Sequence, residues 1–238
     1  MTKRRDITAR PGQAPEAVSS RSEIEAFLSE AGRIAPAAQA RGRLIFALDA
    51  TMSRQPTWDV ACELQAGMFD AAASVGGLAV QLVYFRGVGE SRASSWVANA
   101  SALRDLMVKI DCRGGQTQIG KVLTHVRRET EKRPVAAFAY VGDAMEENPD
   151  TLCQLAGEIG IRGVRAFMFH EGRDPAAERT FREMARLTRG AYLPFNRASV
   201  AELRALLSAV ATYAAGGLEA LEGSRSGEAQ RLLPQLRR

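Results

Sequence analysis

Five short apolar runs, separated by stretches with helical periodicity, constrain the fold of this chain more than any other feature. Runs of this kind are typical of strands that are buried on both faces. They cover residues 43–49, 78–85, 135–142, 163–169 and 191–195. A weaker segment at 94–98 predicts a short antiparallel edge strand. The alternation predicts a three-layer, Rossmann-like α/β fold, in which a mainly parallel central sheet is flanked by helices.

Proline and capping residues mark where helices begin between these strands. Pro56 suits the first turn of a helix, and apolar residues then recur with a 3.6-residue period. Asn148 and Asp174 are each a capping residue followed directly by proline. A capping box at 199–202 opens the last helix of the domain, and the glycine pair at 216–217 ends it.

The chain divides into one domain with an extension at each end. Residues 1–40 are polar and predict a flexible N-terminal extension with one short helix. Residues 41–217 carry the α/β pattern, and 218–238 are a basic C-terminal tail with one short helix. No stretch approaches the roughly 18 apolar residues that a membrane-spanning helix needs. We therefore expect one domain that has no membrane partner.

Cysteine usage and charge indicate the cellular compartment and the classes of partner that the chain can bind. The three cysteines are far apart and form no CxxC pair, so neither a disulfide framework nor a zinc knuckle is predicted. Residues 1–30 contain no hydrophobic signal core, which favours the cytoplasm. The net charge of +5 is concentrated at the two ends, where few aromatic residues accompany it. We expect solubilising tails there, and the scarcity of aromatics argues against nucleic-acid binding.

Polar residues follow the first apolar run directly. Asp49, Thr51 and Ser53 alternate along the chain at the carboxyl end of this predicted strand. Open α/β sheets bind their ligands at that edge. Carboxylate and hydroxyl groups are hard oxygen donors, which Mg²⁺ or Mn²⁺ prefers. The pattern therefore predicts a divalent cation at the end of the first strand.

Two further loops can contribute to the same site. Thr117 lies in a glycine-rich turn at 114–120, and Asp143 follows the apolar run at 135–142. If the strands at 43–49 and 135–142 are neighbours, three hydroxyls and two carboxylates converge on one cation. The predicted ligands are Asp49, Thr51, Ser53, Thr117 and Asp143.

This set, within residues 41–215, resembles the von Willebrand factor type A (VWA) domain and its metal-ion-dependent adhesion site (MIDAS), in a bacterial single-domain form. The first motif of that family is Asp-x-Ser-x-Ser, and here it reads Asp49-x-Thr51-x-Ser53. Thr117 matches the lone threonine of the family, and Asp143 matches its second aspartate.

The chain departs from the family pattern at two positions. Gln116 stands between the paired glycines and the threonine, so the threonine could be displaced. Ala144 replaces a common glycine, which puts a positive-φ turn there in doubt. Neither of these two departures removes a ligand atom. Outside the site, the stretch 181–192 also resembles the penultimate helix of the family and the start of its last strand.

The resemblance implies a binding function. In such sites the hydroxyls bind Mg²⁺ or Mn²⁺ directly, the aspartates often do so through water, and one coordination position stays open. An Asp or Glu carboxylate of a partner protein then completes the six-oxygen shell. The resemblance therefore implies a non-enzymatic, cation-dependent protein-binding module.

Alternatives from other classes stay open. A phosphate-handling enzyme of the haloacid dehalogenase type would use Asp49 as nucleophile and Asp143 on Mg²⁺, but Thr51 stands where that family needs a second Asp as general acid. A P-loop nucleotidase fits most of 115–121, but Val122 occupies the position of its Ser or Thr. A metal-free scaffold whose basic tails bind nucleic acid is a third possibility.

Histidines and acids near the site have simpler explanations. His170 is expected in a loop after the strand at 163–169, making ordinary hydrogen bonds, although it could also contact an acidic group of the partner. His125 is expected to be structural, within a helix. Glu146 and Glu147 either rim the cation site or favour the dipole of a helix that begins nearby.

Overall fold

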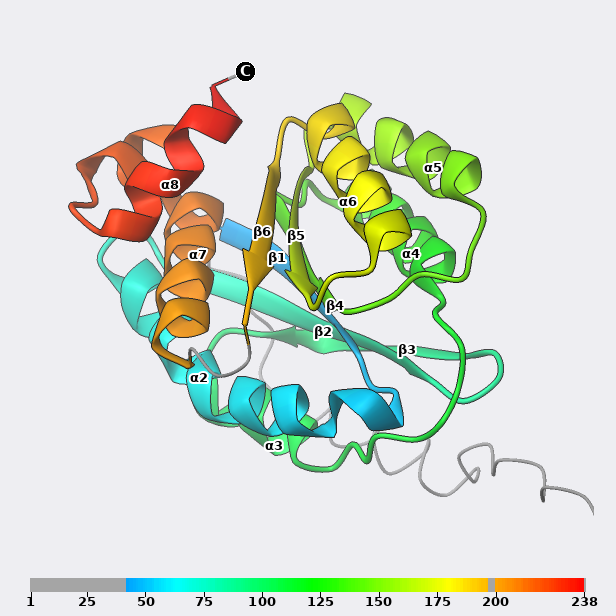
Figure 1. The fold of residues 1–238 in the computed structure, drawn as a ribbon. Helices are drawn as coiled ribbons and strands as arrows, with labels where there is room; N and C mark the ends of the chain where they lie inside the picture. The colour runs from blue at the N-terminus through cyan, green and yellow to red at the C-terminus, as the bar shows by residue number, and fades with distance from the viewer. Residues whose placement is uncertain (1–41, 197–199, 238) are drawn as a thin grey trace, which may run out of the picture.

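A computed structural model describes residues 42–196 and 200–237. The predicted extension at 1–40 and Ser199 of the predicted capping box lie outside these residues. Six strands form one sheet with helices on both faces, which confirms the predicted three-layer α/β fold (Figure 1). Within the described ranges, no helix combines the length and apolar character needed to span a membrane.

The central sheet has the strand order β3-β2-β1-β4-β5-β6. Every neighbouring pair is parallel except β2 and β3, which confirms the expected antiparallel edge. The strands are β1 (Gly42–Asp49), β2 (Leu78–Arg86), β3 (Glu90–Val97), β4 (Ala137–Gly142), β5 (Arg165–Glu171) and β6 (Ala191–Phe195). Nearly all residues of β1, β2 and β4 are buried, as their continuous apolar runs predict.

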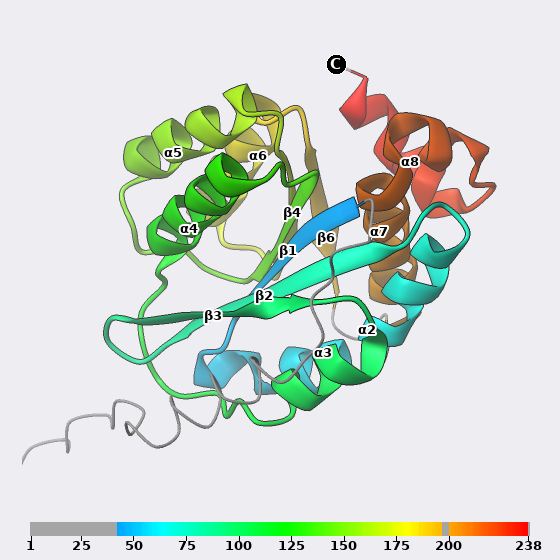
Figure 2. The same ribbon diagram turned by 180° about the vertical axis from the view of Figure 1, so that it is seen from behind.

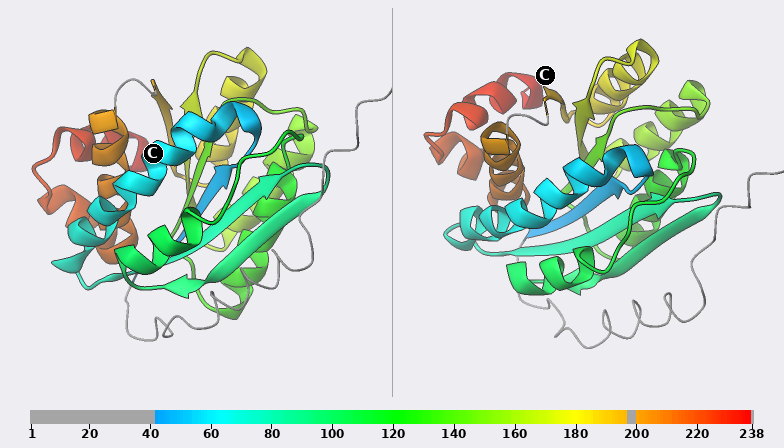
Figure 3. Two further views of the ribbon diagram at one scale, coloured as in Figure 1. Left: turned by 90° about the horizontal axis from the view of Figure 1, so that it is seen from below. Right: turned by 60° about the horizontal axis from the view of Figure 1, so that its bottom comes forward.

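Two layers of helices enclose the sheet. Helices α4, α5 and α6 cover one face, and α2, α3, α7 and α8 cover the other, as Figures 2 and 3 show. The bounds are η1 (Met52–Arg54), α2 (Gln55–Ala73), α3 (Ala100–Met107), α4 (Ile119–Lys132), α5 (Pro149–Ile161), α6 (Pro175–Leu187), α7 (Val200–Gly223) and α8 (Gly227–Leu236). Each layer packs over its own cluster of buried apolar residues, so both faces of the central strands are shielded from solvent.

The predicted helix starts are confirmed where the structure describes them. The Asn148 side chain accepts hydrogen bonds from the backbone N–H groups of residues 150 and 151, and Asp174 accepts one from that of Ala177. In each case a proline follows in the first turn, where the missing N–H costs no hydrogen bond.

The order of connections creates a switch point in the sheet. From β1 the chain passes to β2 on one side, and later it returns to β4 on the other side of β1. The loops after β1 and β4 therefore leave the sheet in opposite directions and open a crevice at its carboxyl edge. Residues 44–48 of β1 pair with residues 137–141 of β4, so Asp49 and Asp143 emerge close together.

The C-terminal residues are more ordered than the sequence analysis expects. Gly217, with φ at +70°, kinks α7, but the chain continues as helix to Gly223 and then forms α8. Leu232 and Leu236 of α8 are almost completely buried. The sequence predicts one short helix there, but its leucines alone do not show which surface of the domain they contact.

Helix α8 also protects the edge strand β6. The side chain of Gln235 accepts a hydrogen bond from the backbone N–H of Tyr192 at 3.0 Å, and it donates one to the Tyr192 carbonyl at 3.4 Å. An amide side chain thus takes the place of a neighbouring strand, which leaves less of this edge open to pairing with other chains.

Candidate metal centre

The loop after β1 is organised around Asp49, the last residue of that strand. Asp49 is 3% exposed, and its Oδ1 accepts a hydrogen bond of 2.8 Å from the backbone N–H of Thr51. Aspartate favours this contact with a residue two positions ahead, and the contact turns the chain. The hydroxyl oxygens of Thr51 and Ser53 then lie 3.3 Å apart. The three polar side chains of the first motif therefore gather at one point.

The loop before α4 brings Thr117 to the same edge of the sheet. Gly115 lies so close to Gly87, in the turn between β2 and β3, that a Cβ on Gly115 would stand 2.4 Å from the Gly87 backbone. Only glycine permits this approach. The N–H of Thr117 donates to the Glu146 carboxylate at 2.8 Å, and the N–H of Glu146 donates to the Thr117 hydroxyl at 3.1 Å. Thr117 thus stays at the site despite the inserted Gln116.

The loop after β4 contributes Asp143, whose side chain is 31% exposed. Arg189 is the only non-glycine residue with positive φ in the described chain, so Ala144 adopts no conformation that needs glycine. Glu147 accepts hydrogen bonds of 2.6 and 2.8 Å from the first two backbone N–H groups of α4. Glu146 therefore faces the site, whereas Glu147 caps a helix that begins 28 residues earlier in the chain.

Neither histidine lines the pocket of the predicted ligands. His170 is inside β5 and is 1% exposed, so the prediction of a loop histidine is wrong. Its Nε2 donates to the carbonyl of Asp143 at 3.3 Å, and its Nδ1 lies 2.7 Å from the Tyr192 hydroxyl. His125 lies within α4 and bonds to Gln81 at 2.9 Å, as expected for a structural residue. Strand β5 continues to Glu171, two residues beyond the apolar run at 163–169, so the apolar pattern could not indicate that His170 belongs to the strand.

All five predicted ligands line one pocket of about 220 Å³ at the carboxyl edge. Since one water molecule occupies about 30 Å³ in the liquid, the pocket has room for a cation with several waters. Glu146, which the sequence analysis left undecided, lines it as well. The five predicted residues are Asp49, Thr51, Ser53, Thr117 and Asp143.

The chemistry of these groups suits a hard divalent cation. Among the residues described, no three His, Cys, Asp or Glu side chains come together as a metal site, so any ion here must rely on hydroxyls. Hydroxyl and carboxylate oxygens match the preference of Mg²⁺. Burial raises the pKa of Asp49 to about 6, and the charge of Asp143 adds to this, against the hydrogen bond from Thr51 and the charge of Arg54. A bound cation would relieve the cost of this buried carboxylate.

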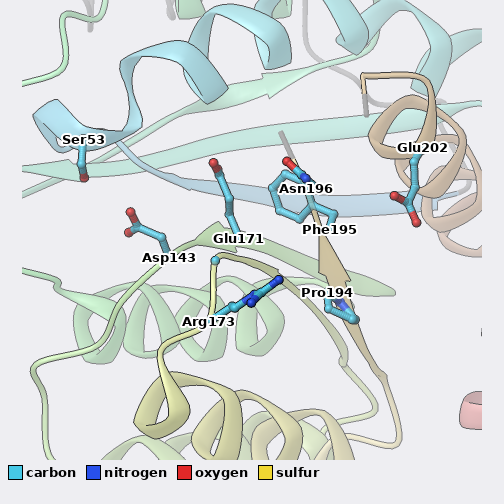
Figure 4. A pocket seen from close by; sticks show the side chains of 9 residues that line it. Ser53, Asp143, Glu171, Arg173, Pro194, Phe195, Asn196 and Glu202 are labelled. Carbon is cyan, nitrogen blue, oxygen red and sulfur yellow. The ribbon is translucent and has the colours of Figure 1, made fainter. Parts of the chain in front are cut away.

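A second, larger pocket of about 660 Å³ adjoins the first, because Ser53 and Asp143 line both. Figure 4 shows the Ser53 hydroxyl and the Asp143 carboxylate pointing toward each other at one end of it. Glu171 lies in the middle, and Phe195 and Glu202 lie toward the other end. The predicted cation position therefore adjoins a larger cavity that has both polar and apolar walls.

Arg54 is the residue of this region that the sequence analysis missed. It directly follows the first motif, yet its side chain is only 2% exposed and is the largest of the fully buried ones. One of its terminal nitrogens forms a close ion pair with Glu171 and lies 3.7 Å from the Asp143 carboxylate. The available signal was a charged residue directly after the predicted ligand motif, at the edge of the sheet where the cation is predicted.

Comparison with known proteins places the fold. No protein-family model matches the chain, and no curated protein matches it by sequence. Solved structures do match. An aerotolerance-related membrane protein from Bacteroides fragilis NCTC 9343 has a TM-score of 0.55 at 14% identity, over 71% of this chain and 98% of that one. The VWA domain of SpRpn10 has a TM-score of 0.55 at 12% identity, over 74% and 97%.

A third similar structure contains a metal at a MIDAS motif. Proximal thread matrix protein 1 from the mussel byssus, with a zinc-occupied MIDAS motif, has a TM-score of 0.53 at 13% identity, over 71% of this chain and 45% of that one. At these identities the likeness concerns the fold alone. The chain therefore has the fold of a VWA domain, and the function of its site is argued from its own residues.

Proposed function

We propose that this protein is a non-enzymatic, divalent-cation-dependent binding module, in which an Asp or Glu carboxylate of a partner protein completes the coordination of the cation. One observation carries the proposal: five oxygen-bearing side chains from three separate loops line a single pocket at the switch point of the sheet. The cation is Mg²⁺ or Mn²⁺, which both accept this set of ligands. It would be held by Asp49, Thr51, Ser53, Thr117 and Asp143.

The neutral hydroxyls give the site its chemistry. A bound cation supplies Lewis acidity toward a carboxylate oxygen. Thr51, Ser53 and Thr117 donate oxygen lone pairs without negative charge, so only two of the five proposed ligands are carboxylates. Arg54 adds a further positive charge beside Asp143. The five proposed ligands therefore balance the charge of the ion without exceeding it, and they leave one of six coordination positions for a carboxylate oxygen of the partner.

The adjoining cavity gives a partner room to approach. It begins at Ser53 and Asp143 and extends along the ends of β5 and β6 to Glu202 (Figure 4). A partner segment that places its acidic residue at the cation can lay neighbouring side chains against Phe195 and Pro194. The cytoplasmic location is part of the same proposal, supported by three cysteines that are all free.

The phosphate-handling alternative has less support. Helix α3, not a strand, leads into the glycine-rich loop, and the Lys121 ammonium is bonded to the Gly89 carbonyl and to Gln118. A P-loop needs that lysine to contact phosphate. The Thr51 hydroxyl lies within hydrogen-bond distance of the Ser53 hydroxyl. A hydroxyl cannot serve as the general acid that a haloacid dehalogenase needs at this position. These contacts favour binding over catalysis.

Calorimetric titration of Mn²⁺ and Mg²⁺ into metal-stripped protein tests the proposal. We expect about one ion per chain and loss of binding in Asp49→Ala and Thr117→Ala, because each removes a ligand of the same ion. Glu147→Gln is the matched control, since this acid neighbours the site but caps α4. If the ligand variants bind as the wild type does, the assignment is wrong.

The open coordination position has its own test. We expect millimolar acetate to tighten Mn²⁺ binding, whereas acetamide, of the same shape but neutral, leaves it unchanged. Equal effects of the two would contradict carboxylate capture. Phosphatase and ATPase assays complete the test, because turnover that is lost in Asp49→Ala would establish the enzymatic alternative instead.

A further inference from the structure

Arg54 has an unusual position for a charged residue. It ends the 3-10 helix η1, directly after the motif that supplies three of the five proposed ligands. Its side chain is 2% exposed, so the guanidinium has little access to water. Arginine remains charged even when buried. The protein therefore places a permanent cation beside the site that is proposed to bind a divalent one.

The hydrogen bonds of Arg54 are incomplete. Nη1 pairs closely with Glu171 and lies 3.7 Å from Oδ2 of Asp143, which is longer than a hydrogen bond. Nε and Nη2 are buried and have no hydrogen-bond partner among the described residues. A guanidinium carries five N–H donors, and a buried charge with unmet donors is unstable unless an anion compensates it. Asp143 is the second anion within its reach.

Glu171 is the closer of the two acids that pair with Arg54. Its Oε2 accepts the Arg54 ion pair and also a hydrogen bond of 2.6 Å from the Thr57 hydroxyl. Glu171 lies at the end of β5 and Thr57 lies on α2, so both positions are set by the scaffold. This arrangement holds the guanidinium toward Glu171, at a distance from Asp143 that leaves the aspartate available to another cation.

We propose that Arg54 is a resident competitor of the divalent cation: it shares Asp143 with the ion, weakens ion binding by like-charge repulsion, and is restrained by Glu171. This inference rests on the proposed function, since it describes the regulation of the same site. It makes the metal affinity depend on the partner, because an incoming carboxylate offsets the positive charge that Arg54 and the ion share.

Opposite charge changes at the two residues provide the test, with Mn²⁺ calorimetry as the readout. Arg54→Met keeps a long apolar stem and removes the charge, and we expect it to bind Mn²⁺ about tenfold more tightly. Glu171→Gln leaves Arg54 with Asp143 as its remaining ion-pair partner, and we expect weaker binding. Arg54→Lys keeps the charge and is expected to stay closer to the wild type than Arg54→Met.

A purely structural role of this pair predicts a different result, because disturbed packing would weaken binding in both variants. Weaker or unchanged binding in Arg54→Met overturns the inference. If Arg54→Met fails to fold, the double variant Arg54→Met with Glu171→Gln removes both charges together. Tighter binding than in the wild type supports the inference there, and equal or weaker binding rejects it.

Failure of this inference can be told apart from failure of the proposed function. If the wild type binds Mn²⁺ and Asp49→Ala does not, the site exists, and the Arg54 variants alone decide the competition. If neither the wild type nor Arg54→Met binds the ion, even in acetate, both the cation site and the competitor are rejected.

Discussion

Two buried arginines lie near opposite ends of β1, and they differ in how many hydrogen-bond partners their guanidinium groups have. Arg43 is the second residue of the strand and is 7% exposed, and Arg54 lies five residues beyond its end and is 2% exposed. Arg43 donates to the carbonyls of Arg133 and Pro134 and pairs with Glu129 at 3.4 Å. Its guanidinium also lies 3.8 Å from the ring centroid of Trp96. Both terminal nitrogens of Arg43 therefore have hydrogen-bond partners, and we call this the compensated end of the sheet.

The acids at the two ends show the same contrast. At Glu129, burial would raise the pKa, but hydrogen bonds from Lys132 and Trp96 outweigh it, and the pKa is lowered. At Asp49, burial outweighs the hydrogen bond from Thr51, and the pKa rises to about 6. A buried charge whose partners are all present supports the fold. At the other end, which we call the uncompensated end, a buried carboxylate with a raised pKa lies at the sheet edge where ligands bind, so it is a candidate ligand site.

The largest expected effect is a loss of stability when the hydrogen bonds of Arg43, at the compensated end of the sheet, are removed. Arg43→Met should lower the free energy of unfolding by about 2 kcal/mol, because the arginine's hydrogen bonds are lost while Glu129 keeps Lys132 and Trp96 as partners. Urea denaturation in EDTA measures this change. Arg162→Met is the control, since it removes an exposed arginine paired with Glu131, for which we expect less than about 1 kcal/mol. Mn²⁺ affinity should not change in Arg43→Met, and a change would contradict the contrast between the two ends.

An effect of similar size but opposite sign is expected at the uncompensated end. Asp49→Asn should raise the free energy of unfolding of the metal-free protein by about 2 kcal/mol at pH 7.5, because it removes the charge that burial disfavours. Asparagine keeps the oxygen that accepts the Thr51 hydrogen bond. The same substitution should abolish Mn²⁺ binding. The charge of Asp49 would therefore lower the stability of the metal-free protein and be required for binding the ion.

The pH dependence checks the cause of that stabilisation. The pKa of Asp49 is about 6 in the fold against a usual 3.8, so the folded protein binds this proton more tightly. The stability contributed by protonated Asp49 is fully present below about pH 4 and is lost as the pH rises through 6. Wild type and Asp49→Asn should therefore converge below pH 4. A difference that does not depend on pH would show that packing, not charge, is responsible.

The smallest expected effect sharpens the contrast by removing a single donor. Thr57→Val deletes the hydroxyl that donates to Glu171, and we expect a loss of about 1 kcal/mol in the free energy of unfolding. Mn²⁺ affinity should fall slightly, because Glu171 then holds Arg54 less firmly. Thr130→Val, which removes a hydroxyl bond to a backbone carbonyl in α4, is the matched control and should leave Mn²⁺ affinity unchanged.

Much of the fold and of the candidate site could be predicted because the relevant patterns are local. A buried strand needs a continuous apolar run, so the sequence places β1, β2 and β4 to within two residues. A carboxylate and hydroxyls after such a run indicate a ligand edge, and the structure brings all five predicted residues to one pocket. That these residues bind a cation stays a prediction.

The rest could not be predicted because it depends on contacts between distant segments. The histidine at position 170 continues a strand that its apolar run does not mark, and it is held there by Tyr192 of the next strand. Glu147 caps a helix that begins far before it in the chain. Leu232 and Leu236 are buried only because α8 meets the domain, and their spacing alone does not show which surface they contact.

The sequence by itself therefore determined the class of fold, the order of its elements and the kind of atoms at the ends of its strands. These properties follow from periodicity and from side-chain chemistry, which act over a few residues. Only the tertiary structure decided that both terminal nitrogens of Arg43 have hydrogen-bond partners, whereas Nη2 of Arg54 has none among the described residues. The partners of a buried charge come from strands and helices far away in the chain, and burial makes their presence or absence matter.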